Sequence, residues 1–303
     1  NKAFELLDHI GWGHAPQVLT SLVPQIVSAS RGEESSVWRH PIDVASLVFV
    51  AREDLPALRE RGSRAGPWTG EPALVETLLQ DDPAAAVDAL KNAVASGATH
   101  EELGAAVAYA AFLRMARFHT SNEFSDWNTV HHTVTTANAL HRALRRTPTN
   151  DLLRAVFDTA LAVYHARFLN IPSAALPGPN GRSNGAGPAE AIAGMLDLFD
   201  RQQQVPSAAR QVASYLDSGA PDEDLLATLG HAVMREDAGF HQFQLIEAAF
   251  QQYAQRRGTP EGRVILIAAA RFLAAHFPTV RSVGQTYNTA FRLHRGDQIF
   301  QEG

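Results

Sequence analysis

The chain has 303 residues, a formal net charge of −6 and a hydrophobic fraction of 45%, which is the composition of an ordinary globular protein. Without a basic surplus, we expect no nucleic-acid partner. The longest apolar runs are interrupted by Arg and are shorter than the roughly 20 residues of a membrane helix, so we expect no membrane span and a cytoplasmic location. The absence of cysteine excludes disulfides and thiolate metal sites, so a metal would need His, carboxylate or water ligands.

The N-terminal part of the chain predicts short helices separated by loops. One helix is expected before the Gly-Trp-Gly break at 11–13, and another from Ala15, because Pro is tolerated in a first turn. Prolines between residues 33 and 72 favour loops, with only short helical runs at Val44–Arg52 and around Leu58.

From about residue 71 onward, apolar residues recur at intervals of three and four, which is typical of helices. Helices are expected at 74–80, 83–96, 100–118, 123–146, 150–169, 188–201, 206–217, 222–257, 260–277 and 281–295. Since alternating strand patterns are missing, we predict an all-α protein with one large domain. The Pro- and Gly-rich segment 172–188 cannot sustain a helix and is expected to be an exposed loop that joins two helical halves, 1–171 and 189–303.

Two segments repeat each other weakly across these halves. Ser96–His119 and Ser218–His241 both begin with Ser-Gly-Ala and an acidic first turn, and both end with Phe-His. A duplicated helical unit tends to pack against its copy about a pseudo-twofold axis, so His119 and His241 would come to equivalent places at one metal. The alternative is a generic helix start with a chance match at the end.

Four of the thirteen His lie in the stretch Phe118–Leu144. If this stretch is a helix, His131 and His132 lie on neighbouring stripes and cannot face one point equally. One would bind a metal while the other binds a carboxylate or a backbone carbonyl, as the second nitrogen of ligand imidazoles usually does. A hydrogen-bonded structural role for both is the alternative.

The sequence therefore provides a set of candidates for a metal site. The proposed ligands are His14, His119, His131, His132 and His241. Three further residues, His231, Glu236 and Asp237, are candidates to orient ligands or to transfer protons. We expect His165 in the core, and a surface or helix-end position for His9, His40, His100, His141, His276 and His294. Because Glu-x-x-His motifs are absent, a ferritin-like diiron site is excluded, and His-rich ligation predicts a mononuclear first-row metal, most plausibly Fe(II).

Three segments resemble the questin oxidase-like family, whose members are helical oxygenases linked to oxidative cleavage of aromatic polyketides. His14-Ala15-Pro16 resembles the family's Asn-His-x-Pro helix start, His131–Leu140 its His-x-x-x-x-Thr-Ala-His-Ala run, and His241–Ala248 its His-x-Ile-Lys-x-Thr-Glu-Ala segment. Two positions depart from the family pattern, because Asn138 replaces the second His and Gln244 replaces the Lys. The resemblance implies metal-dependent oxygenase activity with a ligand set that differs in part.

The His pattern and the resemblance together lead to one hypothesis. The protein would be a non-haem Fe(II) oxygenase that acts on an apolar small molecule of aromatic or polyketide type. Because no Gly-rich dinucleotide motif is present, electrons would come from the substrate, from an external reductase or from an electron-transfer domain outside this chain. The rival hypothesis is a non-catalytic helical protein that binds a metal, haem or another ligand, or an interaction scaffold.

Overall fold

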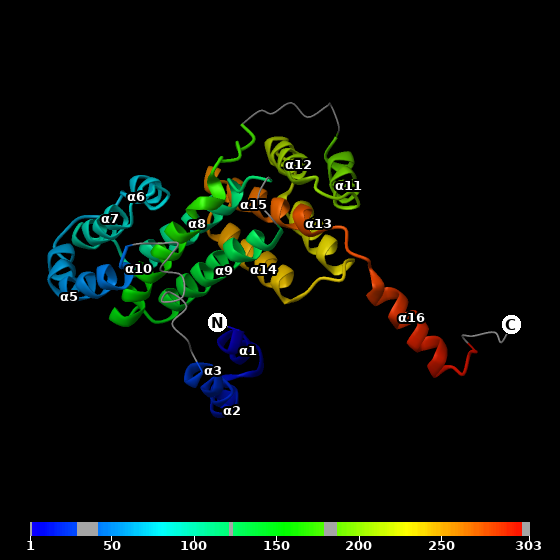
Figure 1. The fold of residues 1–303 in the computed structure, drawn as a ribbon, viewed down its shortest axis with the longest axis horizontal. Coiled ribbons are helices and arrows are strands. Elements are labelled where there is room, and N and C mark those ends of the chain that lie inside the picture. The colour runs from blue at the N-terminus through cyan, green and yellow to red at the C-terminus, as the bar shows by residue number, and fades with distance from the viewer. Residues whose placement is uncertain (1, 29–41, 121–123, 179–186, 299–303) are drawn as a thin grey trace. The chain divides into compact units, whose positions relative to one another are not determined.

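The computed structural model describes residues 2–28, 42–120, 124–178 and 187–298. These residues form helices and connecting turns without any strand, which confirms the predicted all-α fold class (Figure 1). The chain divides into two compact units, the first made of Asn1–Ala108 and Thr136–His165, and the second of Tyr109–Thr135 and Ala166–Gly303. The division falls inside two helices, α8 (His100–Ala116) and α9 (Phe124–Arg146), which therefore contribute residues to both units.

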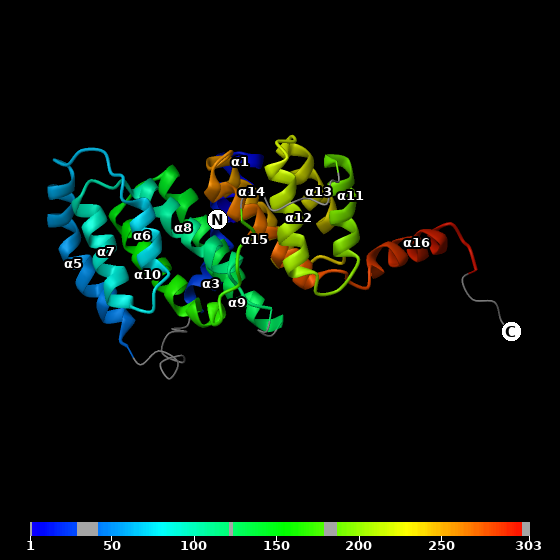
Figure 2. The same ribbon diagram turned by 90° about the horizontal axis from the view of Figure 1, so that it is seen from above.

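In the first unit, α7 (Pro83–Ala95) contacts three other helices. The further elements of this unit are α1 (Lys2–Ile10), η1 (Trp12–His14), α2 (Ala15–Thr20), α3 (Val23–Val27), α5 (Val44–Gly62), α6 (Glu71–Leu78) and α10 (Asn150–His165). Helix α7 packs against α5, α6 and α10 (Figure 2). Its buried side chains Ala86, Leu90 and Ala93 recur at helical spacing, as an inward-facing stripe requires.

One prediction for this unit was wrong, because the two short runs expected near residues 44–58 form a single helix. Helix α5 has 19 residues and contains Pro56. The Asp43 side chain starts it by accepting a hydrogen bond from the Ser46 backbone nitrogen at 3.0 Å. An internal Pro costs about 3 kcal/mol. Burial of Val48, Ala51 and Leu55 offsets that cost, which sequence periodicity alone did not reveal.

In the second unit, α15 (Pro260–His276) is the central helix. The unit also contains η2 (Ala166–Asn170), α11 (Pro188–Phe199), α12 (Val205–Asp217), α13 (Asp222–Met234), α14 (Phe240–Gln255) and α16 (Ser282–His294). Helix α15 packs against α12 and α14, and every residue from 265 to 274 is buried. A helix that is apolar on all sides is typical of a protein core, so the longest apolar run of the sequence is a core helix.

The second unit contains one helix break that the sequence did not predict and part of the predicted loop. The helix expected at 222–257 is two helices, because the chain leaves α13 after Met234 and enters α14 at Phe240. The intervening carboxylates of Glu236 and Asp237 bind backbone groups of the α15–α16 connection, which a continuous helix would not allow. The described part of the loop, up to Gly178, is non-helical as expected, whereas 179–186 lie outside the described residues.

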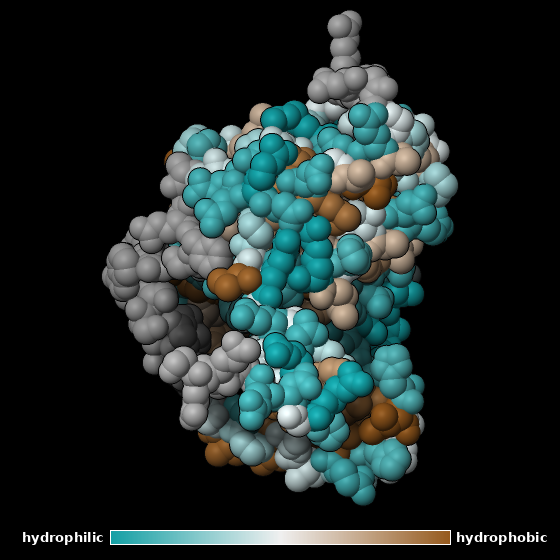
Figure 3. Space-filling model, turned by 90° about the vertical axis from the view of Figure 1, so that its right-hand side faces the viewer, coloured by the Kyte–Doolittle hydropathy of each residue, from teal (hydrophilic) through white to brown (hydrophobic). Residues whose placement is uncertain are grey.

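The described helices include no candidate for a membrane span. None of them combines the length and the hydropathy that a bilayer crossing requires. The face seen in Figure 3 is mainly hydrophilic, with separate hydrophobic patches. Scattered apolar side chains of this kind are normal on globular proteins.

Candidate metal centre

Three His side chains converge in the second unit. One nitrogen each of His131, His132 and His241 can be chosen so that all three lie within 4.8 Å of one another. The ring centroids of His131 and His241 are 4.6 Å apart, and that of His132 is 5.0 Å from each of the other two. Helix α9 supplies the adjacent pair, and the first turn of α14 supplies the third imidazole.

Local structure explains how α9 and α14 present these rings. On α9, Val130 and Val134 are fully buried, so the same side of the helix carries His131 into the core, where it has 0% exposure. His132 follows at the exposed edge of the cluster. On α14, the Gln242 side chain accepts a hydrogen bond from the Gly239 backbone nitrogen at 3.0 Å, which fixes the turn that contains His241.

The adjacent pair meets the cluster unequally, as expected, with His131 buried and His132 exposed. Adjacent helical residues are about 100° apart, so the sequence left open whether one or both would contribute. The imidazole side chain is long enough to compensate, and His241 approaches from a second helix between the two directions. Adjacent His on one helix can therefore contribute to the same cluster when the third group comes from another element.

Burial and mutual repulsion lower the pKa of two of the three imidazoles. Burial lowers the pKa of His131 to about 3, and repulsion from His241, His132 and His276 contributes in the same direction. Burial also lowers the pKa of His132, with a smaller contribution from His241. The lowered pKa values favour the neutral forms of His131 and His132, and the neutral imidazole is the form that offers a lone pair to a metal ion.

Several buried nitrogens in the cluster have no hydrogen-bond partner among the described residues. They are Nδ1 and Nε2 of His131 and Nδ1 of His241. A neutral imidazole has one donor and one acceptor, and leaving such a group buried without a partner costs about 1–3 kcal/mol. Because most buried polar atoms in proteins are satisfied, these nitrogens are candidate ligand-binding atoms.

Aromatic side chains lie next to the cluster. The ring of Phe272 on α15 stacks against His131 at 5.8 Å, and Trp127 lies one turn before His131 with its ring 6.2 Å from Phe272. Phe118 packs on Trp127 at 4.1 Å. These groups give the surroundings of His131 an apolar, low-dielectric character, which strengthens any electrostatic interaction made there.

The structure places the other proposed ligands elsewhere. His14 is exposed in η1, which belongs to the first unit. His119 is half-buried in the connection after α8, where its backbone nitrogen donates to the carbonyl of Leu169 at 3.3 Å. Among the described residues, His119 is not a member of the converging set. His231 is exposed in the last turn of α13.

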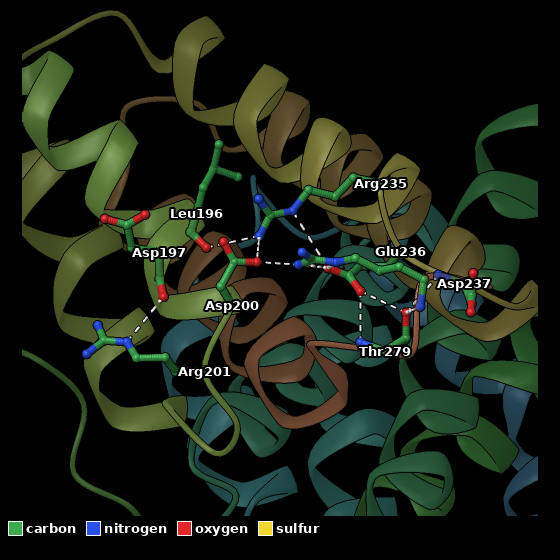
Figure 4. Close-up of polar contacts among 9 residues, drawn as sticks. Leu196, Asp197, Asp200, Arg201, Arg235, Glu236, Asp237 and Thr279 are labelled. Carbon is green, nitrogen blue, oxygen red and sulfur yellow. Dashed lines mark hydrogen bonds and ion pairs between the residues drawn. The ribbon is translucent and has the colours of Figure 1, made fainter. Parts of the chain in front are cut away.

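The two proposed catalytic carboxylates bind parts of the second unit's own backbone and side chains. Glu236 accepts hydrogen bonds from the backbone nitrogen and the hydroxyl of Thr279, both at 2.8 Å, and from Nε of Arg281 at 2.9 Å (Figure 4). Asp237 accepts from the backbone nitrogens of Ser282 and Val283 at 2.6 and 2.9 Å, at the start of α16. These contacts give both carboxylates a structural role that local sequence could not indicate.

His276 lies at a helix end, as expected from the sequence, because it is the last residue of α15. Its ring packs against Phe272 at a centroid distance of 4.1 Å, which is a contact that the sequence did not predict. Burial lowers its pKa, and repulsion from His241 contributes. A signal existed in the sequence, because Phe272 and His276 are four residues apart and share one face of the most apolar helix.

The candidate site thus consists of three converging imidazoles from α9 and α14, with aromatic side chains beside His131. Comparisons of the chain with protein-family models, with curated proteins and with solved structures found no match.

Proposed function

We propose that the second unit binds one divalent first-row transition metal ion through His131, His132 and His241. The observation that carries the proposal is the convergence of three imidazoles, two of which, His131 and His241, have buried nitrogens without a hydrogen-bond partner among the described residues. Nitrogens bound to one metal at about 2.1 Å lie roughly 3.0–3.4 Å apart. The present separations are up to 4.8 Å, so metal binding would require the nitrogens to move closer together.

The ligand number favours a functional metal over a purely structural one. Structural zinc sites are closed by four protein ligands, whereas three protein ligands leave a position for water or substrate. Imidazole suits zinc, copper, iron and nickel alike, so the donor set does not select among them. The aromatic side chains beside His131 favour an apolar ligand over a highly charged one.

We extend the proposal to a non-haem Fe(II) oxygenase for an aromatic or polyketide-like small molecule. The resemblance of His131–Leu140 and His241–Ala248 to the questin oxidase-like family supports this extension. When bound, Fe(II) would supply a site for dioxygen and for the one-electron chemistry that amino-acid side chains lack. The protein would supply ligands, an apolar surround and exclusion of bulk water.

Elemental analysis tests the metal site. Protein without an affinity tag, loaded with Fe(II) under anaerobic conditions or with Zn(II) and then desalted, should retain about one metal per chain. His131→Ala and His241→Ala should lose the metal and keep their helical circular dichroism. His294→Ala, at the exposed end of α16, is the matched control. Full metal occupancy in both cluster variants would refute the proposal.

Two further variants decide whether the ligand set is larger. His14→Ala and His119→Ala test the remaining ligands proposed from the sequence. Loss of metal from either variant would add that residue to the set, and unchanged occupancy would remove it. Dioxygen consumption by the Fe(II)-loaded protein with hydroxylated aromatic compounds then tests the oxygenase, with the Zn(II)-loaded protein as control. Retained metal without dioxygen consumption across that series would favour the non-catalytic alternative.

A further inference from the structure

The first unit contains a pocket that the proposed metal centre does not use. It is lined by residues of α6, of α7 and of the segment before α6, and its volume is about 280 Å³. Among the lining residues, Leu74 and Ala93 are buried, whereas Asn92 and Ser96 are exposed. The pocket therefore combines an apolar base with a polar rim. All of its lining residues belong to the first unit.

Trp68 lines this pocket and lies directly against Gly70. A Cβ atom added at Gly70 would be 2.6 Å from Nε1 of Trp68 and 3.1 Å from its Cε2. Such a contact is too close, so any side chain at Gly70 would force the indole to shift. The backbone of Gly70 has a φ of −86°, which any residue can adopt. Space for the indole, and not backbone conformation, is therefore what glycine supplies here.

Two hydrogen-bonding groups at the pocket are not used by the protein itself. Nε1 of Trp68 and the side-chain amide of Asn92 have no hydrogen-bond partner within the described ranges. The hydroxyl of Thr77, by contrast, donates to the carbonyl oxygen of Ala73 at 3.0 Å. An indole N–H can only donate, and an amide can both donate and accept. The pocket thus offers N–H donors to a ligand that carries an acceptor atom.

The lining favours a small, uncharged ligand. The lining residues that the structure describes include no Asp, Glu, Lys, Arg or His. A charged group placed among them would lose hydration without gaining an ionic partner. Small-molecule pockets usually have volumes of about 300–1,000 Å³, so this pocket suits a ligand of one or two rings. The indole of Trp68 favours an aromatic ring, because aromatic pairs gain energy beyond the burial of their surfaces.

We propose that this pocket binds a small neutral aromatic molecule whose carbonyl oxygen, or an equivalent acceptor, takes a hydrogen bond from Nε1 of Trp68. Asn92 supplies a second polar contact, and Leu74 and Ala93 supply the apolar surface. Gly70 is a positioning residue, because it lets the indole lie where it does. The site is independent of the second unit, so its existence does not depend on whether His131, His132 and His241 bind a metal.

Benzamide is a suitable probe, because it combines one aromatic ring and an amide acceptor with no charge. Fluorine NMR of the full chain labelled with 5-fluorotryptophan reports on its four tryptophans, and Trp68→Phe assigns the signal of Trp68. Benzamide should shift that signal saturably, with a Kd of about 1 mM, the usual order for so small a ligand. The signal of Trp127 should stay unchanged. Benzoate has the same ring with a negative charge, and it should bind about 10-fold more weakly.

Two glycine variants form a matched pair. Gly70→Ala places a Cβ against the indole and should weaken benzamide binding about 10-fold, the effect of losing one well-placed hydrogen bond. Gly66→Ala adds the same atom where no other atom lies within 4 Å, so it should bind benzamide like wild type. Ala89→Leu fills the pocket from α7 and should weaken binding without displacing Trp68. All three variants should keep the helical circular dichroism of wild type.

Three results would overturn the inference. The first is the absence of a saturable shift of the Trp68 signal with benzamide. The second is equal affinity for benzamide and benzoate, which would contradict selection by an uncharged lining. The third is wild-type affinity in Ala89→Leu, which would place the binding outside the pocket, and this variant decides the question even if Gly70→Ala fails to fold.

Discussion

At the scale of single residues, His131 represents the clearest conflict between stability and function. Its side chain is completely buried, and neither of its ring nitrogens has a hydrogen-bond partner among the described residues. Such a group destabilises the metal-free protein and becomes favourable only when a ligand satisfies it. Functional sites commonly show this trade-off.

We therefore predict that His131→Leu stabilises the metal-free protein by about 1–2 kcal/mol, because it replaces an unsatisfied buried imidazole by an apolar group. Urea unfolding in the presence of a chelator measures this change. With saturating zinc the order should reverse, because only wild type gains binding free energy. His132→Leu, at an exposed position, should change the metal-free stability much less. A destabilised His131→Leu protein in chelator would show that the ring has a partner that satisfies it.

The sequence predicted the centre of this site but not its surroundings. Clustering of His in one helical stretch, together with the match at His241, was enough to name the three imidazoles that converge. The partners of Glu236 depend on contacts between residues more than forty positions apart, such as Glu236 with Thr279. Periodicity reports which face of a helix is buried, but it does not report which other helix that face meets.

At the scale of elements, the connection between α15 and α16 is held by one buried carboxylate. Burial raises the pKa of Glu236, but hydrogen bonds from Arg281 and Thr279 more than offset this effect, so its pKa lies below the ordinary value of 4.5. Arg235 lies 3.6 Å from the same carboxylate, and both Arg235 and Arg281 also pair with Asp200. The carboxylate thus fixes the end of the helix that carries His276.

Glu236→Gln should destabilise the protein by about 2–3 kcal/mol at neutral pH. This is less than the 3–5 kcal/mol typical of a fully buried pair, because the Arg281 side chain is 38% exposed. A depressed folded-state pKa contributes stability above the unfolded value, and that contribution disappears as pH falls through the folded pKa. The difference between wild type and variant should therefore be complete above pH 4.5 and shrink below it.

Urea unfolding at a series of pH values from neutral to about pH 3 measures this dependence. Glu190→Gln, an exposed glutamate in the first turn of α11, is the matched control and should show little difference at any pH. A variant whose stability deficit stays constant across this range would show that shape, and not charge, explains the role of Glu236.

Helices α15 and α16 differ sharply in how they are held. Residues 265–274 of α15 are buried, whereas the structure records no buried residue in α16. The hydrogen bonds from Ser282 and Val283 to Asp237 hold the first turn of α16. Helices with few buried contacts open at low free energy, so we predict fast amide exchange in α16 and slow exchange in α15.

Asp237→Ala should accelerate exchange in α16 further, by several-fold, because loss of a capping carboxylate costs about 1 kcal/mol. Exchange in α15 should stay unchanged. Hydrogen–deuterium exchange with mass spectrometry distinguishes the two helices within one experiment. Protection of α16 equal to that of α15 would show that α16 is covered in solution.

Element boundaries were predictable where local chemistry decides them and not where packing does. The start of α15 follows directly from Thr259, whose side chain caps Gly262, and Pro260 in the first turn. The continuation of α5 through Pro56 and the break at residues 235–239 are decided by contacts with distant segments. Sequence periodicity alone therefore predicted both of these boundaries incorrectly.

At the scale of the whole molecule, the chain forms two compact units whose boundary the sequence does not mark. The halves predicted on either side of the loop 172–188 stay a prediction, while the boundary between the compact units falls inside α8 and α9. No Pro, Gly cluster or charge run marks residues 108–109 or 135–136. Helices that pass from one unit to the other keep an uninterrupted helical pattern, so composition gives no boundary there.

The three imidazoles of the proposed metal centre all belong to the second unit, which leads to a prediction about stability. A ligand stabilises only the structure that unfolds when it is released, by about 2.7 kcal/mol at a hundredfold excess over Kd. For a unit of this size that raises the melting temperature by roughly 5–10 °C. The shift should appear in the second unit and not in the first.

Tryptophan fluorescence can follow the two units separately, because Trp127 is buried in the second unit and Trp68 lies in the first. In variants that retain only one of these tryptophans, zinc should raise the melting temperature reported by Trp127 and leave that reported by Trp68 unchanged. Adding His131→Ala to each variant should abolish the shift. Equal shifts at both tryptophans would mean that the units unfold as one cooperative structure, since coincident transitions are the mark of a two-state process.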